Sequence, residues 1–185
     1  MTGLRHDAKA ATIPAMVVNV DIDGGRLGPI AERARNFLVA VDDSQEAKLA
    51  MRFAAGRAAH VEGGGVILFH AIAPGDFQHW MAVAERMREE AWDEAKAMLE
   101  DLAAKLYAYS GVKPEIVLRE GEPKDALLDF IKERDDLFAL ILASSPSGEP
   151  GPLVEYFSGP LIAGLPCPVV ILPGTLEPDA IDRMV

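Results

Sequence analysis

The chain has 185 residues, of which 50% are apolar and 25% are charged, and its formal net charge at pH 7 is -11. This length allows one buried core with an extension, and this composition is typical of a globular protein. The acidic excess argues against nucleic-acid binding, because the sequence offers no basic stripe to neutralise phosphates. We therefore expect no nucleic-acid partner.

One cysteine and four histidines limit the metal and redox chemistry of the chain. Cys167 has no partner for an internal disulfide and no nearby His or Lys to stabilise a thiolate, so we expect a structural role. His6, His60, His70 and His79 fall at no metal-ligand spacing, so we expect no metal site. No apolar run reaches the roughly 18 residues of a membrane span. We expect a cytoplasmic protein without a membrane partner.

The first part of the chain lacks a strong periodic pattern. Gly24, Gly25 and Pro29 are turn-forming residues, and Ala15–Asp23 alternates only imperfectly between apolar and polar positions. We interpret residues 1–36 as a partly ordered N-terminal extension, with a short edge strand at Ala15–Asp23 as the alternative.

From residue 37 onwards, short apolar runs alternate with helical patterns. The predicted strands are Phe37–Asp42, Val66–Ile72, Lys113–Glu120, Leu137–Ala143 and Pro168–Leu172. The predicted helices start at Asp43 or Ser44 and run to about His60, and then cover Asp76–Tyr109, Lys124–Arg134 and Leu153–Ala163. This alternation is typical of a three-layer, doubly wound α/β domain with a five-stranded parallel sheet. We assign it residues 37–174, followed by a C-terminal tail at 175–185.

The helix expected at Asp76–Tyr109 is the longest periodic segment. Its apolar residues recur every three or four positions, and acidic residues occupy the other face. A single helix of this length would measure about 50 Å at 1.5 Å per residue, which is more than a small domain is wide. We expect its first turns to bend over the sheet edge or to project towards an unknown protein partner.

Several segments resemble the universal stress protein family. They are FLVAVDDSQEA at Phe37–Ala47, the Gly121–Pro123 turn, the strand at Leu137–Ala143 and the CPVVIL segment at Cys167–Leu172. The resemblance implies a Rossmann-like, adenine-nucleotide-hydrolase-like fold with strand order 3-2-1-4-5. It also implies a homodimer that pairs through the fifth strand, at Val169, Val170, Ile171 and Leu172. An exposed apolar edge strand would otherwise be a site of unwanted association.

Typical members of that family bind ATP through a last loop of the form Gly-x2-Gly-x9-Gly-Ser/Thr, and this chain departs from it. In one register the four positions fall on Ala143, Pro146, Tyr156 and Phe157. In the other they fall on Gly148, Gly151, Leu161 and Ile162. A proline has no N–H to offer a phosphate, and a tyrosine ring keeps a ligand away from the backbone.

Ligands of doubly wound sheets bind at the carboxyl ends of the strands, which defines a candidate nucleotide cleft. The candidate residues at this edge are Val41, Asp42, Ala71, Ile72, Ser144, Ser145, Gly148, Gly151 and Ser158. The resemblance implies that Asp42 contacts the adenine or ribose and that the backbone of Ala71 holds the adenine. Asp42 or Asp43 could instead cap the following helix.

Other nucleotide and phosphate folds do not fit the sequence. An acidic pair after the first strand also occurs in response-regulator receiver domains, but the third strand here ends in Arg119–Glu120 and the fifth in Leu172–Pro173. The receiver's phospho-acceptor Asp and its Lys are therefore missing. The chain also contains no P-loop, G-x-G-x-x-G or G-x-S-x-G motif.

The loop after the fourth strand offers few groups to a polyanion. Pro146 and Pro150 lack an N–H, Glu149 adds negative charge, and no Lys or Arg occurs between Arg134 and Arg183. We predict a non-enzymatic regulatory module of the stress response that needs no cofactor and does not bind ATP tightly. The alternatives are an ATP- or AMP-binding switch or slow ATPase that uses Asp42 and the loop, and a purely structural partner protein that uses the long helix.

Overall fold

The structure, a computed structural model, describes residues 35–73 and 81–185. The expected N-terminal extension, the possible strand at Ala15–Asp23, and His79 and Trp80 lie outside these residues. The described elements include five strands: β1 (Arg35–Ala40), β2 (Gly64–Ile72), β3 (Glu115–Glu120), β4 (Leu137–Ala143) and β5 (Val169–Leu172). The helices are α1 (Gln45–Ala59), α2 (Met81–Ser110), α3 (Pro123–Glu133), α4 (Pro152–Ser158), the 3-10 helix η2 (Pro160–Gly164) and α5 (Pro178–Asp182).

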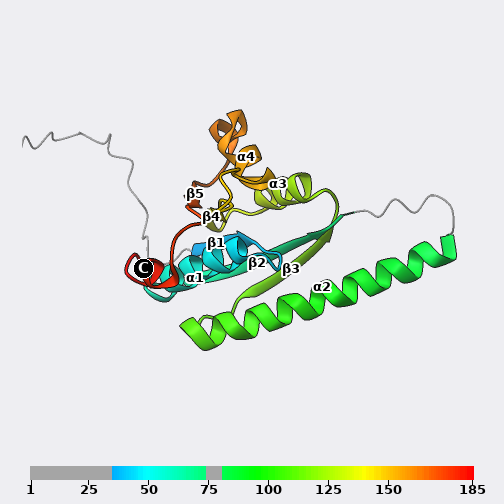
Figure 1. Ribbon diagram of the computed structural model, residues 1–185, viewed down its shortest axis with the longest axis horizontal. Helices are drawn as coiled ribbons and strands as arrows, with labels where there is room; N and C mark the ends of the chain where they lie inside the picture. The colour runs from blue at the N-terminus through cyan, green and yellow to red at the C-terminus, as the bar shows by residue number, and fades with distance from the viewer. Residues whose placement is uncertain (1–34, 74–80) are drawn as a thin grey trace, which may run out of the picture. The chain divides into compact units, whose positions relative to one another are not determined.

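The five strands form one parallel sheet in the order β3-β2-β1-β4-β5, which confirms the predicted order (Figure 1). Phe37 of β1 lies between Val66 of β2 and Ala139 of β4. β1 is central because its side chains are apolar on both faces, so it can be covered by helices on either side. The parallel arrangement brings the carboxyl ends of β1, β2 and β4 to the same edge of the sheet.

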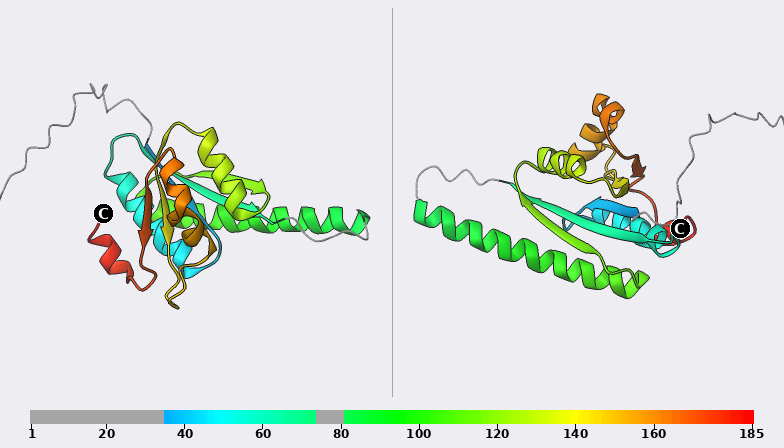
Figure 2. Two further views of the ribbon diagram at one scale, coloured as in Figure 1. Left: turned by 90° about the horizontal axis from the view of Figure 1, so that it is seen from above. Right: turned by 180° about the vertical axis from the view of Figure 1, so that it is seen from behind.

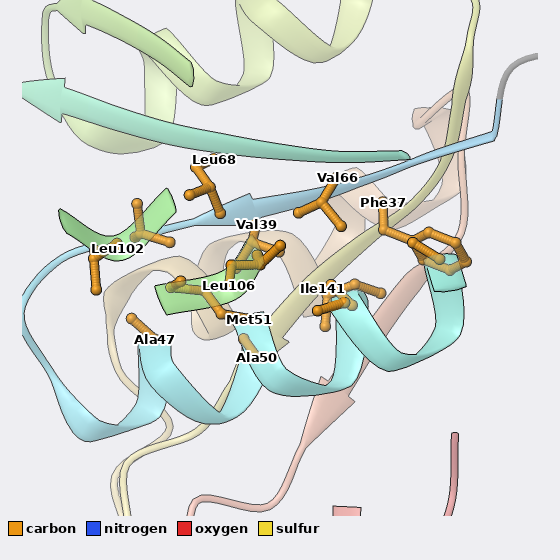
Figure 3. Close-up of a cluster of buried hydrophobic side chains, with 14 of the residues drawn as sticks. Phe37, Val39, Ala47, Ala50, Met51, Val66, Leu68, Leu102, Leu106 and Ile141 are labelled. Atoms are coloured by element: carbon orange, nitrogen blue, oxygen red, sulfur yellow. The ribbon is translucent and has the colours of Figure 1, made fainter. Parts of the chain in front are cut away.

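One face of the sheet packs against α1 and α2. Figure 3 shows this core, where Phe37 and Val39 of β1 and Val66 and Leu68 of β2 point towards the helices. The helices contribute buried residues that are at most 6% exposed, among them Ala47, Ala50, Met51, Leu102 and Leu106. Small alanines on α1 let this helix lie close to the sheet.

The opposite face packs against α3 and α4. Leu38, which alternates with Phe37 and Val39 along β1, points to this side and packs with Ile67 and Phe69 of β2. The Phe69 ring lies 5.3 Å from the ring of Phe130 on α3, measured between centroids. The sheet is thus the middle layer of three, as predicted.

The predicted helix at Leu153–Ala163 is interrupted. It consists of α4, which ends at Ser158, and the 3-10 helix η2, which starts at Pro160. Gly159 between them has an extended backbone, with φ -79° and ψ -160°. Pro160 cannot donate a helical hydrogen bond and clashes with a preceding helical turn, so the α-helix ends here.

α2 is a single helix of 30 residues, about 45 Å long. Among residues 85–110 of α2, whose side chains the structure describes, the first buried one is Ala95, and residues 85–90 are all exposed. Figures 1 and 2 show this N-terminal part of α2 extending beyond the sheet. Arg88 holds it to the end of β3, because its Nε donates to Oε2 of Glu120 at 2.9 Å.

The segment expected to be a C-terminal tail contains α5, which lies beside α1 (Figure 2). Ile181 of α5 is fully buried. A helix of five residues is too short to show a hydrophobic period, so the sequence pattern did not predict it. Within the described ranges, no helix combines the length and apolar character needed to span a bilayer.

Candidate functional site

Two adjacent hollows lie at the carboxyl ends of β1, β2 and β4, and together we call them the candidate cleft. The larger, of about 280 Å³, lies between α1, the end of β4 and the start of α4. The smaller, of about 110 Å³, lies between the ends of β1 and β2 and the start of α3. Both are lined by Ala40, Asp42 and Leu153, so Asp42 stands where they meet.

The candidate cleft brings together five of the nine residues that the sequence indicated. Asp42, Ser145 and Gly151 line the larger hollow. Val41 and Ala71 line the smaller one, together with Asp42. These five residues lie at the carboxyl ends of the central strands. That a ligand binds across them stays a prediction.

The other four predicted residues, Ile72, Ser144, Gly148 and Ser158, line neither hollow. The carbonyl oxygen of Ile72 accepts a hydrogen bond from the Gly121 N–H at 2.9 Å. Ser158 is an exposed residue at the end of α4. Gly148 has a φ of +96°, which glycine adopts readily, and a Cβ at this position would meet no atom within 4 Å. Its backbone conformation therefore forms the turn of the loop.

The Ser144 hydroxyl is used to join β4 to the end of β5. Its Oγ accepts a hydrogen bond from the Gly174 N–H at 3.2 Å and donates to the Leu172 carbonyl oxygen at 3.4 Å. The Ser144 N–H also donates to the Leu172 carbonyl oxygen, at 2.9 Å. These bonds use Ser144 to position the loop after β4, and its predicted contact with a ligand stays a prediction.

The acidic pair after β1 divides into two roles, and neither residue is the helix cap. Ser44 is the N-cap of α1, because its Oγ accepts from the Ala47 N–H at 3.1 Å. Asp42 supports this turn through Oδ1, which accepts from the Ser44 N–H at 2.9 Å. Oδ2 of Asp42 has no hydrogen bond to any described residue, which leaves it able to accept one from a ligand. Asp43 instead holds Lys48, with 3.0 Å between Oδ1 and Nζ.

The charge of the candidate cleft is negative. Asp42 and Glu46 are the ionisable residues that line the larger hollow, and the described lining of either hollow includes no Lys or Arg. Pro150 and Pro152 lie on the same wall and have no N–H. Ser145 Oγ is 2.8 Å from Ser147 Oγ, so these hydroxyls are partly satisfied by each other.

Sequence reasoning did not identify Ser44, Glu46, His70, Pro123 and Leu153 as lining residues. Ser44 and Glu46 follow Asp42 closely in the chain. The sequence predicted that a helix starts there, and this helix start could have indicated that both residues lie near Asp42. His70 Nδ1 lies 2.7 Å from the Val41 carbonyl oxygen, which fixes its ring beside the cleft. Pro123 and Leu153 reach the cleft from two other helices, and no spacing in the sequence relates them to Asp42.

Neither metal nor thiol chemistry is indicated at this site. Among residues 35–73 and 81–185, no group of three or more His, Cys, Asp or Glu side chains is arranged to hold a metal ion. Cys167 is buried, and this burial raises the pKa of its thiol. A buried thiol with a raised pKa has little thiolate at neutral pH, consistent with a structural role.

A family profile and the solved structures that resemble this chain indicate the same protein family. Residues 33–173 match the profile of the Universal stress protein family. The structure of the universal stress protein UspA from Lactobacillus plantarum is 18% identical, with a TM-score of 0.61, and the match covers 76% of this chain and 98% of that chain. None of the curated proteins matches the chain.

Two further structures of this family contain nucleotides. The universal stress protein from Archaeoglobus fulgidus in complex with dAMP is 26% identical, with a TM-score of 0.54, and the match covers 74% of this chain and 96% of that chain. An Arabidopsis thaliana family protein with AMP bound is 18% identical, with a TM-score of 0.54, covering 75% of this chain and 91% of that chain.

Proposed function

Because this chain belongs to the universal stress protein family, we propose that it is a non-enzymatic regulatory module of the stress response whose cleft does not bind ATP tightly. The fold alone does not indicate catalysis, because one fold can carry many different functions. The nature of the cleft then decides which ligands it can hold.

The observation that carries this proposal is the charge of the candidate cleft. The carboxylates of Asp42 and Glu46 line the larger hollow. The lining residues that the structure describes include no Lys or Arg. A triphosphate brought here would be repelled by both carboxylates and would find no cationic side chain to offset its charge. Pro150 and Pro152 also remove two amides from the wall that would cradle phosphates.

The size of the cleft points the same way. The larger hollow, at about 280 Å³, is slightly smaller than the roughly 300–1,000 Å³ typical of small-molecule pockets. A nucleoside or a monophosphate is a better match to this volume than a triphosphate. The cleft therefore favours small, weakly charged occupants.

A second candidate function is an AMP-binding switch, which the dAMP complex of the 26% identical relative favours. In this arrangement the free Oδ2 of Asp42 would accept a hydrogen bond from a ribose hydroxyl. Ser145 and Gly151 line the same hollow and would lie towards the phosphate. Slow ATP hydrolysis would require this binding first.

Calorimetric titration with ATP, AMP and adenosine separates these functions. We expect no saturable heat with ATP up to about 1 mM, which corresponds to a binding free energy weaker than about -4 kcal/mol. Micromolar binding of ATP would overturn the proposal. Micromolar binding of AMP that is lost in Asp42→Ala would favour the switch, and Asp43→Ala is the matched control because Asp43 pairs with Lys48 outside the cleft lining.

We also propose that the protein is a homodimer that pairs through β5. β5 is the last strand of the sheet and pairs with β4 on one side. Ile171 is 37% exposed, which is high for an apolar strand residue between half-buried Val170 and buried Leu172. An apolar edge strand that is left open invites pairing with another chain, and pairing with an identical strand is the simplest closed arrangement.

A further inference from the structure

A groove between α1 and α2 is separate from the candidate cleft and has a different character. Its volume is about 220 Å³. It is lined by three cationic residues, four apolar residues and one tyrosine, namely Lys48, Arg52, Lys105, Met51, Ala55, Leu102, Leu106 and Tyr109. It shares no lining residue with either hollow of the cleft. We call it the helix groove.

The floor of the helix groove is apolar. Met51 of α1 and Leu102 and Leu106 of α2 are core residues that keep 4–5% of their surface exposed at this floor, and Ala55 beneath them is fully buried. Figure 3 shows Met51 and Leu106 side by side between the two helices, with Leu102 one turn away. A floor of this kind favours an apolar ligand body over water.

The rim of the helix groove is cationic. Lys48 and Arg52 come from α1, Lys105 comes from α2, and no acidic residue is among the described residues that line the groove. This is unusual in a chain with 29 acidic and 18 basic residues. Each cation has an acidic partner, Asp43, Asp182 and Asp101 respectively, but these partners lie outside the lining. Because an ammonium has three N–H donors and a guanidinium five, each cation keeps donors beyond those that its acidic partner accepts.

One wall of the groove is held in place before any ligand arrives. The Arg52 guanidinium carbon lies 4.4 Å from the centre of the Tyr109 ring. Asp182 of α5 accepts hydrogen bonds from Arg52 Nε at 2.6 Å and from the Tyr109 hydroxyl at 2.7 Å. Because these contacts fix both side chains, less conformational entropy is lost when a ligand packs against them.

We propose that the helix groove binds an amphipathic monocarboxylate, a small molecule with an aromatic or short aliphatic body and one carboxylate. The body lies on the apolar floor and the carboxylate faces the cationic rim. A neutral ligand of the same shape would make only the apolar contacts with the floor. A ligand with an ammonium group would be repelled by the cations of the rim. The volume limits the ligand to a small molecule.

Three probes of matched shape test the charge requirement: phenylbutyrate, phenylbutanol and phenylbutylamine. NMR titration of the Met51 methyl signal reports occupancy of the floor. We expect phenylbutyrate to shift this signal with a Kd of about 1 mM or tighter, and phenylbutanol to bind about tenfold more weakly. We expect phenylbutylamine to bind more weakly still. Equal binding of the acid and the alcohol, or an unmoved Met51 signal at about 10 mM phenylbutyrate, would overturn the proposal.

Variants test the rim directly. Lys48→Gln combined with Lys105→Gln removes two cations and leaves a polar side chain at both positions. The side chains of Lys48 and Lys105 are 38% and 68% exposed, so we expect the fold to be retained. We expect phenylbutyrate binding to weaken about tenfold and phenylbutanol binding to stay unchanged. Lys96→Gln is the matched control, because Lys96 is on α2 and pairs with Glu100 away from the groove. Unchanged phenylbutyrate binding in the double variant, or an equal loss in Lys96→Gln, would contradict the assignment.

Discussion

Arg52 of α1 holds Asp182 of α5 through two hydrogen bonds, one from Nε and one from Nη2. This bidentate pair joins segments 130 residues apart and positions the short C-terminal helix against α1. The Tyr109 hydroxyl donates to the same carboxylate, so the pair also connects α5 to α2. Together with the buried Ile181, it explains how five residues remain helical without a long periodic face.

The Asp182 carboxylate predicts a specific loss of stability in acid. Its hydrogen bonds with Arg52 first, and then with Tyr109, lower its pKa from 3.8 to about 2. Because the folded pKa lies below the unfolded one, ionised Asp182 stabilises the fold above about pH 4, and this contribution disappears as the pH falls towards about 2. Asp182→Asn should therefore unfold at lower urea concentration than the wild type at pH 7, and the difference should narrow between about pH 4 and about pH 2.

Asp179→Asn is the control for this pH dependence. It removes a carboxylate from the same helix and leaves the contact between Arg52 and Asp182 in place. We expect the stability difference between Asp179→Asn and the wild type to be smaller at pH 7. A difference for Asp182→Asn that stays constant down to pH 2 would show that the ion pair does not set the acid response.

Gly174 cannot accept a side chain without moving the loop of the candidate cleft. A Cβ at this position would overlap the Ser144 carbonyl oxygen and lie 2.9 Å from the Pro146 nitrogen. Both are backbone atoms, so a rotamer change cannot relieve the clash. We expect Gly174→Ala to lower the free energy of unfolding by about 2 kcal/mol or more, measured by urea denaturation.

Gly164→Ala is the matched control for that substitution, since a Cβ there meets no atom within 4 Å. We expect it to change stability by no more than about 0.5 kcal/mol. Equal stabilities for the two variants would mean that the loop after β4 adapts freely, and that Ser144 does not fix it.

The sheet was predictable from the sequence because buried parallel strands leave a strong pattern. The apolar runs that became β1 and β4 are flanked by turn residues, and alternation with helices limits the topology to few choices. The order of strands came from the resemblance and is confirmed. Asp42 was predicted as a site residue because it follows β1, and every parallel strand presents its carboxyl end at the same edge.

The parts that escaped prediction depend on contacts between segments distant in sequence. Ser144 was expected to offer its hydroxyl to a phosphate, but the hydroxyl bonds the end of β5. Lys48 and Lys105 flank one groove only because α1 and α2 pack together. By contrast, the cap of α1 is a local contact that the sequence had narrowed to Asp43 or Ser44, and the structure selects Ser44, whose Oγ accepts from the Ala47 N–H.

Glu46 gives a direct test of whether charge limits phosphate binding in the candidate cleft. Its half-buried carboxylate lines the larger hollow, so Glu46→Gln removes one repulsive charge while keeping the size of the side chain. We expect the weak affinity for ATP, measured by NMR titration up to about 10 mM ligand, to rise about threefold or more, that for AMP to rise less, and that for adenosine to stay unchanged.

Glu94→Gln is the control, because Glu94 is an exposed residue of α2 that does not line the cleft. A similar gain in both variants would indicate a general effect of net charge. A gain for adenosine as large as that for ATP would show that Glu46 acts through shape, and that repulsion of phosphates is not what limits binding.

The edge of β5 provides the test of the homodimer. Ile171 is 37% exposed on this strand, and a lysine on an edge strand is a common way in which proteins prevent strands from pairing between chains. We expect the wild type to sediment as a dimer and Ile171→Lys to sediment as a monomer in analytical ultracentrifugation, with the circular dichroism spectrum preserved. Ile162→Lys, at a residue that is 49% exposed in η2, should leave the dimer intact. A monomeric wild type, or a dimer that survives Ile171→Lys, would rule out pairing through β5.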